Sequence, residues 1–320
     1  MRAFVLSSTE IPPALTEIDC PEPSRGEVRL KIAACGLNFA DLLMTTGKYQ
    51  ERPPLPFTMG MEVAGTIDAL GEGVTGFAVG QRVAAFFGRG GLAEYGCFPA
   101  SSCLPIPDAM PFEHAAGFMV AYGTSHVALT RRARLQAGET LLVLGAAGGV
   151  GLTAVEIGAR LGAKVVAVAR GAEKLKVAEA AGASVLIDSD SEDLKGQFKA
   201  LGGVDVVYDA VGEPMASAAL RALNPEGRYV TIGFAGGGVP HFPANILLVK
   251  NIDVIGLYWG GYATFRPKVL TDSLRDLMGM YAQGLLHPHV SHTLPLERAA
   301  EGMDLLRSRT STGKVVITMG

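Results

Sequence analysis

The hydrophobic and polar positions divide the chain into two parts of different texture. Before residue 112, short apolar runs alternate with turn residues, as in "MRAFVL", "EVRLKIAAC", "VAGTIDALG" and "QRVAAFF". Runs of this length, broken at short intervals, are typical of β-strands. The segment "GEGVTGFAVGQRV" predicts a series of tight turns, because glycine adopts a positive φ at low cost. This part therefore predicts a compact, mostly antiparallel β domain, with a barrel as one possible form.

The pattern changes after Pro111, a residue type that often begins a helix. Buried-strand and helix patterns then alternate. The strand-like runs are "TLLVLG", "KVVAVAR", "VDVVYDAVG", "GRYVTIG" and "IDVIGLYWG", and the helix-like segments between them are Val150–Leu161, Ala172–Ala181 and Met215–Leu223. Continuous Val, Ile and Leu runs joined by helices indicate a parallel sheet covered on both faces. A last helix and strand are predicted in "LERAAEGMDLLRSR" and "GKVVITM".

Length and composition narrow the class of protein. A chain of 320 residues exceeds what one hydrophobic core usually supports, so two domains are expected. The net charge of -3 argues against a nucleic-acid surface. No apolar run approaches the roughly 18 residues of a membrane span, and the N-terminus lacks the pattern of a signal peptide. We expect a cytoplasmic protein without membrane partners.

The cysteines give no sign of a metal or redox motif. None of the four has another cysteine at the two-residue gap of such motifs. We expect Cys20, Cys35, Cys97 and Cys103 to be reduced thiols packed as small apolar residues.

The stretch "LLVLGAAGGVG", Leu141 to Gly151, has the spacing of a dinucleotide-binding turn. Ala146, Gly148 and Gly151 occupy the three slots of a G-x-G-x-x-G/A fingerprint, with Ala in the first. A turn without side chains lets backbone N–H groups approach a pyrophosphate, and the following helix adds a partial positive charge. The alternative is a plain structural turn. The residues expected to bind the pyrophosphate are Ala147, Gly148, Gly149, Val150 and Gly151.

The end of the next strand bears on the choice of cofactor. NAD sites usually place an Asp or Glu about 20 residues after the turn. Here "KVVAVARGAEK" has Arg170 at that point, and Lys174 follows one helical turn later. Both cations attract a 2′-phosphate, which favours NADPH over NADH. The alternative is a pair of solvated charges partly neutralised by Glu173.

The chain resembles the zinc-independent quinone oxidoreductase branch of the medium-chain dehydrogenase/reductase superfamily from Met1 to Gly320. The resemblance is carried by "ACGLNFADLLMTTGKY", "PFTMGMEVAGTIDALGEGV", "GTSHVAL", "GAAGGVG", "VDVVYDAVG" and "PLERAAEGMDLL". It implies an α/β fold with a GroES-like β-rich catalytic domain at 1–118 and 260–320, and a Rossmann doubly wound parallel sheet at 119–259. Relatives often pair through the strand at "NIDVIGLYWG", which implies a homodimer, with a tetramer as the alternative.

The resemblance also bears on zinc. In zinc-dependent members a Cys lies three residues before Asp41, where this chain has Asn38. The second zinc motif, Gly-His-Glu, is Gly60-Met61-Glu62 here. Loss of a thiolate and an imidazole leaves no suitable ligand set, so we expect no metal. Without a Lewis acid, the reaction favours acceptors that take hydride readily, such as quinones and enones.

The resemblance assigns candidate residues to the substrate side. The Asn38 amide would hydrogen-bond the nicotinamide ribose or a substrate carbonyl, or else only a loop backbone. Asp41 is an acid near the site or a local capping residue. Tyr49 would donate its phenol or stack on a flat acceptor, unless it is a structural aromatic.

On the cofactor side, Thr124 would meet the nicotinamide carboxamide, unless it is an ordinary helix residue. Val211, Phe234 and Ala235 would border the nicotinamide. Trp259 would wall the substrate pocket or contribute to a dimer contact. One departure opposes NADPH: Asp188-Ser189 stands where NADPH-binding members carry a Tyr.

Together these features predict an NADPH-dependent reductase that transfers hydride to a quinone or an α,β-unsaturated carbonyl without a metal. Two alternatives remain. One is an enoyl-thioester reductase, which delivers hydride to a conjugated alkene in the same way. The other is a non-catalytic NADPH-binding protein with a structural or regulatory role.

Overall fold

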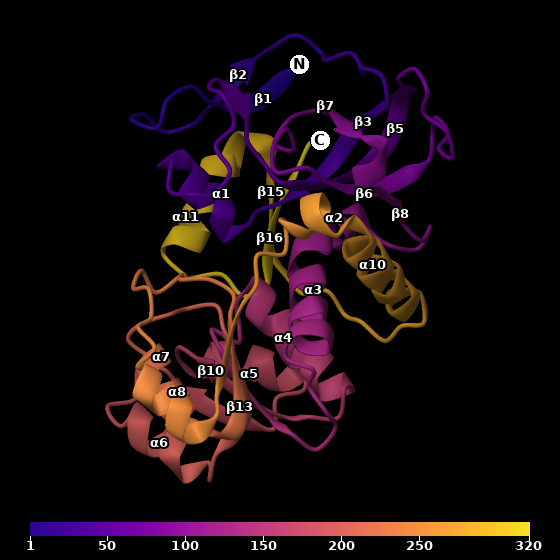
Figure 1. Cartoon of the computed structure of the whole chain (residues 1–320). Helices are drawn as coiled ribbons and strands as arrows, with labels where there is room; N and C mark the ends of the chain where they lie inside the picture. Colours follow the sequence, from indigo (N-terminus) through magenta and orange to yellow (C-terminus); the bar gives the residue numbers. More distant parts are fainter. The chain divides into compact units, whose positions relative to one another are not determined.

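The computed structural model describes residues 1–320 and divides into two compact units (Figure 1). Unit 1 consists of Met1–Val120 and His287–Gly320, so it is built from both ends of the chain. Unit 2 is the intervening segment, Ala121–Leu286. The first boundary lies two residues from the expected one, whereas the second lies at His287 instead of residue 260. No helix of the chain has the length and apolar character needed to cross a membrane.

Unit 1 contains two β-sheets. The smaller sheet has the order β2-β1-β4, with bounds Ala14–Glu17, Arg2–Leu6 and Phe57–Thr58. The larger sheet has the order β15-β16-β3-β5-β6-β8, with bounds Val290–Pro295, Lys314–Thr318, Glu27–Gly36, Glu62–Leu70, Arg82–Phe86 and Cys103–Pro105. Strand β7 (Tyr95–Pro99) also pairs with β3. Every pairing in these sheets is antiparallel except that of β15 with β16, as the turn-rich sequence predicts.

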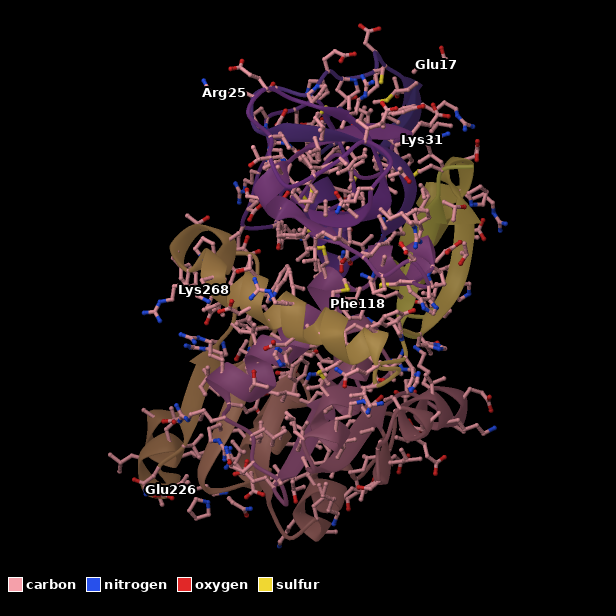
Figure 2. The ribbon with its side chains drawn as sticks, turned by 90° about the vertical axis from the view of Figure 1, so that its right-hand side faces the viewer. Glu17, Arg25, Lys31, Phe118, Glu226 and Lys268 are labelled. Carbon is pink, nitrogen blue, oxygen red and sulfur yellow. The ribbon has the colours of Figure 1, made fainter.

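Five short helices complete unit 1: α1 (Phe39–Thr45), η1 (Ala100–Ser102), α2 (Phe112–Ala116), η3 (Leu296–Arg298) and α11 (Ala299–Arg307). Helix α11 buries Ala299, Gly302 and Met303, the spacing of one helical face. Charged side chains such as Arg25 and Lys31 lie at the surface of this unit (Figure 2), whereas Phe118 is buried. The C-terminal strand β16 pairs with β3, so the two ends of the chain share one core.

Unit 2 is built on a six-stranded parallel sheet with the order β11-β10-β9-β12-β13-β14. The bounds, in that order, are Val185–Asp188, Lys164–Ala169, Thr140–Leu144, Val204–Asp209, Leu223–Thr231 and Asp253–Gly256. The strand order reverses between β9 and β12, which is the doubly wound Rossmann arrangement. The central strands β9 and β12 are mostly apolar and largely buried, because helices cover both faces.

The helices of unit 2 follow the predicted alternation. They are α3 (Met119–His126), which begins in unit 1, the π-helix η2 (Val127–Arg132), α4 (Gly149–Arg160), α5 (Ala172–Ala180), α6 (Leu194–Ala200), α7 (Ala216–Ala222), α8 (Ala244–Lys250), α9 (Tyr262–Phe265) and α10 (Pro267–Ala282). Helix α10 explains the displaced boundary. It packs on η2 and α9, and Ser273 hydrogen-bonds the His126 ring at 2.8 Å, so this segment belongs to unit 2.

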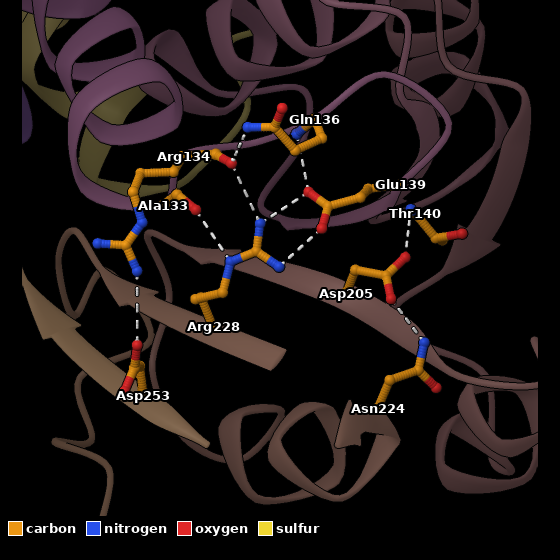
Figure 3. Close-up of polar contacts among 9 residues, drawn as sticks. All are labelled: Ala133, Arg134, Gln136, Glu139, Thr140, Asp205, Asn224, Arg228 and Asp253. Atoms are coloured by element: carbon orange, nitrogen blue, oxygen red, sulfur yellow. Dashed lines mark hydrogen bonds and ion pairs between the residues drawn. The ribbon is translucent and has the colours of Figure 1, made fainter. Parts of the chain in front are cut away.

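The amino-terminal edge of the parallel sheet is held by a polar network (Figure 3). The Arg228 guanidinium donates two hydrogen bonds to the Glu139 carboxylate, at 2.7 and 2.8 Å, and one to the Ala133 carbonyl. The Asp205 carboxylate accepts from the Thr140 N–H and from Asn224. Because these side chains hydrogen-bond one another and the backbone, we infer that they have a structural role. The opposite, carboxyl edge carries the candidate binding groups.

Candidate functional site

The glycine turn connects β9 to α4 in a very small space. Gly145 has a φ of +76°, and its carbonyl accepts the Gly148 N–H at 3.0 Å. A Cβ at Gly151 would lie 2.0 Å from the Gly145 carbonyl oxygen. Only glycine permits this approach of helix to turn, which is the physical reason for the fingerprint spacing.

Helix α4 begins without a cap. Its N-cap residue, Gly148, has no side chain, and no acidic residue lies in its first turn. The N–H groups there have no partner within the helix, and the helix dipole adds positive charge. Gly148 is exposed, and Gly149 and Val150 are half-buried, whereas Ala147 is buried. The helix start is therefore suited to a phosphate group.

Asp209 shapes the neighbouring loop at the end of β12. Its fully buried carboxylate accepts the N–H groups of Val211 and Gly212, both at 2.8 Å, and the Tyr229 hydroxyl at 2.6 Å. Burial raises the pKa of the Asp209 carboxyl, while these hydrogen bonds oppose the shift. The resulting turn gives Gly212 a φ of +82°. Asp209 was not among the site residues expected from the sequence.

The loops after β9, β12 and β13 meet at this carboxyl edge. A Cβ at Gly145 would lie 2.9 Å from a Val211 methyl group. The Val211 carbonyl accepts the Gly236 N–H at 2.7 Å, and the Ala235 N–H donates to the Ala210 carbonyl. The structure thus brings Val211 and Ala235, together with the adjacent exposed Phe234, to the edge where doubly wound sheets bind ligands.

Arg170 follows β10, the strand beside β9, and its side chain is more than half exposed. Its Nε donates to the Asp190 carboxylate at 3.1 Å. Glu173, which the sequence suggested as the neutralising acid, instead pairs with Lys176 at 2.8 Å. Lys174 lies in the first turn of α5. Arg170 is therefore presented to solvent at the carboxyl edge, with Asp190 as a competing anion.

The Asp188 carboxylate holds the backbone of this region. It accepts the Gly171 N–H at 3.1 Å and the Asp190 N–H at 3.0 Å. The two hydrogen bonds lower the pKa of the Asp188 carboxyl. Asp188 thus positions Asp190 near Arg170.

Thr124 is buried in α3, and its neighbour Ser125 ties that helix to α4. The Ser125 hydroxyl lies 2.8 Å from the Val150 carbonyl and 3.0 Å from the Tyr208 hydroxyl. Trp259 packs on the same helix, since a Cβ at Gly123 would lie 2.7 Å from its indole. We did not predict this role of Ser125 from the sequence. The only hint was its position as a small polar residue in helix α3.

In unit 1, three side chains far apart in the sequence form a buried cluster. The Lys314 Nζ donates to the Asn38 Oδ1 and the Glu62 Oε1, both at 2.7 Å. The Asn38 Nδ2 donates to the Glu62 Oε1 at 3.0 Å. Glu62 is 1% exposed and Lys314 8%. A buried ion pair of this kind depends on full hydrogen bonding, which the cluster provides. Sequence reasoning did not single out Lys314.

Asp41 lies beside this cluster but is fully buried. Its Oδ2 accepts the Asn38 N–H at 2.8 Å, whereas its Oδ1 has no hydrogen-bond partner. Burial raises the pKa of the Asp41 carboxyl to about 7. These contacts favour the capping alternative at the start of α1 over direct contact with a ligand. Tyr49 is half-buried in the segment between α1 and β4.

The four cysteines form no disulfide. Burial raises the pKa of the Cys35 thiol, and it raises that of Cys97 to about 11 and that of Cys103 to about 12. Cys35 is buried, as expected, whereas Cys20 is exposed, contrary to the expectation of a packed thiol. The raised pKa values make these three thiols poor nucleophiles.

Two family models match the chain. The alcohol dehydrogenase GroES-like domain matches residues 24–108, and the zinc-binding dehydrogenase model matches residues 149–273. Among curated proteins, the quinone oxidoreductase-like protein 2 homolog of Nematostella vectensis is 39% identical over 297 residues. That alignment covers 91% of this chain and 81% of the relative.

Solved structures also show similarity to quinone oxidoreductases. The quinone oxidoreductase of Thermus thermophilus, whose structures include its complex with NADPH, is 34% identical with a TM-score of 0.88. The Escherichia coli quinone oxidoreductase complexed with NADPH is 28% identical with a TM-score of 0.91. Both comparisons cover 100% of each chain. The chain therefore belongs to the quinone oxidoreductase branch of the medium-chain dehydrogenase/reductase superfamily.

Proposed function

We propose that this chain is an NADPH-dependent reductase that transfers hydride to a quinone or another α,β-unsaturated carbonyl without a metal. The observation that carries the proposal is the uncapped start of α4 on a glycine turn, at the carboxyl edge that also presents Arg170. The NADPH complexes of two quinone oxidoreductases with the same fold support this choice of cofactor.

In this proposal, different residues of unit 2 bind different parts of the cofactor. The turn from Ala147 to Gly151 binds the pyrophosphate through backbone N–H groups. Arg170 and Lys174 attract the 2′-phosphate, a group that NADH lacks. Thr124, Val211, Phe234 and Ala235 border the nicotinamide ring. When bound, the dihydronicotinamide supplies the hydride.

The residues of unit 1 do not fit a zinc ion. Asn38 and Met61 offer an amide and a buried thioether where zinc-dependent members have a thiolate and an imidazole. The Glu62 carboxylate is already paired with the Lys314 ammonium. The chain also has no group of three or more His, Cys, Asp or Glu side chains that could hold a metal. The proposed reaction therefore uses an acceptor that is electrophilic by itself.

The proposal includes a homodimer formed through β14. This strand pairs only with β13, so its other edge is available for another strand. Val254 on β14 is exposed, and nearby in the chain Leu248 and Val249 of α8 are 78% and 76% exposed. Exposed apolar side chains on β14 and on α8 favour association of two copies.

One experiment tests the activity directly. NADPH oxidation is measured with quinones, enones and enoyl thioesters, and the binding of NADPH and NADH is measured separately. We expect turnover with quinones or enones. Turnover with enoyl thioesters alone would show that the chain is an enoyl-thioester reductase. Tight NADPH binding without turnover of any acceptor would favour the non-catalytic alternative.

A further inference from the structure

Three buried hydroxyl groups meet next to the first turn of α4. They belong to Ser125 of α3, Thr153 of α4 and Tyr208 of β12. Ser125 and Tyr208 are 0% exposed, and Thr153 is 7% exposed. The Ser125 Oγ lies 2.8 Å from the Thr153 Oγ1 and 3.0 Å from the Tyr208 hydroxyl. Buried hydroxyls depend on their neighbours for hydrogen bonds, so the neighbours determine which oxygen donates.

The carbonyl of Val150 determines the direction of these hydrogen bonds. It lies 2.8 Å from the Ser125 Oγ, and a carbonyl only accepts, so Ser125 donates its one hydroxyl hydrogen there. The two lone pairs of Ser125 then accept from Thr153 and Tyr208. Ser125 is the only hydrogen-bond partner of the Tyr208 hydroxyl. The hydroxyls are therefore aligned, with Ser125 donating to the Val150 carbonyl at the end.

Thr153 adds to the attachment from within α4. Its hydroxyl also lies 3.1 Å from the Val150 carbonyl and 3.0 Å from the Ala121 carbonyl of α3, so these acceptors share its hydrogen with Ser125. A serine inside a helix often donates to the carbonyl four residues earlier in its own helix. For Ser125 that residue is Ala121, yet Ser125 donates to α4 instead. The hydroxyls thus join α3 to the start of α4.

Val150 is the residue where these hydroxyls meet the candidate phosphate site. Its N–H is one of those at the helix start that have no partner within the helix. The first N–H of α4 that is bonded to the preceding turn is that of Leu152, which donates to the Gly148 carbonyl at 2.8 Å. In a helix, the N–H and C=O of one residue point in opposite directions along the axis. A carbonyl held by Ser125 therefore fixes the direction of the Val150 N–H.

We propose that Ser125, Thr153 and Tyr208 are positioning residues for the pyrophosphate. Their aligned hydroxyls hold the Val150 carbonyl, so the Val150 N–H is already directed at the phosphate position before the cofactor binds. Donors that are ordered in advance lose less conformational freedom on binding, which increases affinity. The identity of the ligand rests on the proposed function, whereas the alignment of the hydroxyls does not.

The alignment is tested by NMR in the protein without ligand. The Gly151 N–H belongs to the same peptide group as the Val150 carbonyl, so its resonance reports the hydrogen bond to that carbonyl. We expect the Gly151 amide proton to move upfield in Ser125→Ala. A smaller shift is expected in Tyr208→Phe, because the Ser125 hydroxyl becomes a weaker donor when it accepts one hydrogen bond fewer. Tyr208→Phe keeps the ring in place, so it tests the alignment even if Ser125→Ala fails to fold.

The matched control is Tyr122→Phe. The Tyr122 hydroxyl also joins α3 to α4, because it donates to the Glu156 Oε2 at 2.6 Å, but this contact lies about two helical turns after Val150. We expect the control to lose stability and to leave the Gly151 resonance unchanged. The alignment would be wrong if the resonance stayed in place in both Ser125→Ala and Tyr208→Phe, or if it moved as far in the control.

The role in binding is tested by calorimetric titration with four ligands. NADPH, NADH and ADP-ribose contain a pyrophosphate, whereas adenosine 2′-monophosphate does not. We expect Ser125→Ala to weaken binding of the first three alike, by about 3- to 10-fold, and to leave binding of the fourth unchanged. Tyr208→Phe should weaken binding about 2- to 3-fold by itself but add nothing in the Ser125→Ala background, because it acts through Ser125. Equal losses with all four ligands, or additive losses in the double variant, would refute the positioning role.

Failure of this proposal can be told apart from failure of the proposed function. A wild-type protein that binds none of the three pyrophosphate ligands would contradict the proposed cofactor, while the NMR test of the hydroxyls would still apply. Wild-type binding that is unchanged in Ser125→Ala would refute only the positioning role.

Discussion

At Asp41, burial and hydrogen bonding act in opposite directions on one carboxyl. Burial raises its pKa, and the Glu62 carboxylate adds to the rise, while the Asn38 N–H and the Lys314 ammonium lower it. Burial is the largest effect, so the pKa reaches about 7. The folded protein therefore holds a proton on Asp41 at pH values where the unfolded chain has already lost it.

This difference predicts a pH dependence of stability. Between about pH 4 and pH 7 the folded state binds more protons than the unfolded state, so the free energy of unfolding falls as the pH rises. Above the folded pKa of about 7 the contribution is constant. We expect Asp41→Asn to flatten this decline, as measured by urea unfolding at pH 5, 6, 7 and 8. Exposed Asp108 gives the control, Asp108→Asn. Identical pH profiles for Asp41→Asn and the wild type would contradict the assignment.

Arg170 and Asp190 predict opposite changes in cofactor selectivity. If Arg170 binds the 2′-phosphate as proposed, Arg170→Asp removes a charge-assisted hydrogen bond, so NADPH binding should weaken about 10- to 100-fold and NADH binding much less. Asp190→Asn frees the guanidinium and should strengthen NADPH binding. Because both side chains are more than half exposed, this gain should be only about 2- to 3-fold.

Calorimetric titration of both cofactors measures these changes. An equal loss of NADPH and NADH affinity in Arg170→Asp would show that Arg170 does not recognise the phosphate. At this scale the sequence identified Arg170, but it assigned the competing charge to Glu173. The Asp190 contact depends on how the loop after β11 folds back beside β10, which no local pattern records.

At the scale of elements, the turn between β9 and α4 has no room for a side chain at Gly151. We expect Gly151→Ala to displace the turn and weaken NADPH binding by at least about 10-fold, because a misplaced helix start loses hydrogen bonds to the pyrophosphate. The control is Gly279→Ala in α10, where a Cβ meets nothing within 4 Å. That variant should be more stable by about 0.5–1 kcal/mol with unchanged binding. Fluorescence titration and thermal unfolding measure the two properties. Unchanged NADPH binding in Gly151→Ala would contradict the role of this turn.

The predicted elements agree closely where apolar periodicity is strong. Helix α4 was predicted to begin at Val150 and begins at Gly149. Helix α10 was not predicted, although Leu270, Leu274 and Leu277 give it an amphipathic face. That omission also explains the expected domain boundary at residue 260. The chain returns to unit 1 only after α10, because the apolar face of this helix packs within unit 2.

At the scale of the whole molecule, the open edge of β14 predicts the assembly. A lysine at Val254 would place a charge on this edge, and natural sheets use such charges to block strand pairing. We expect Val254→Lys to shift the protein from dimer to monomer, as measured by light scattering. The control Val79→Lys alters an exposed valine of unit 1 and should leave the mass unchanged. A wild-type protein that is monomeric at micromolar concentration would refute the dimer.

Sequence alone determined the features that depend on neighbours along the chain. These are the alternation of buried strands and helices, the glycine turn, Arg170 after its strand, and the absence of a Cys and a His at Asn38 and Met61. Tertiary structure decided the features that depend on distant residues. Asn38 and Lys314 are 276 positions apart, yet the Lys314 ammonium donates to the Asn38 Oδ1 in the folded chain. Burial raises the pKa of Asp41 to about 7, while its Oδ2 accepts the Asn38 N–H. Hydrogen bonding and desolvation act through space, so only the folded chain reveals which groups remain available to a ligand.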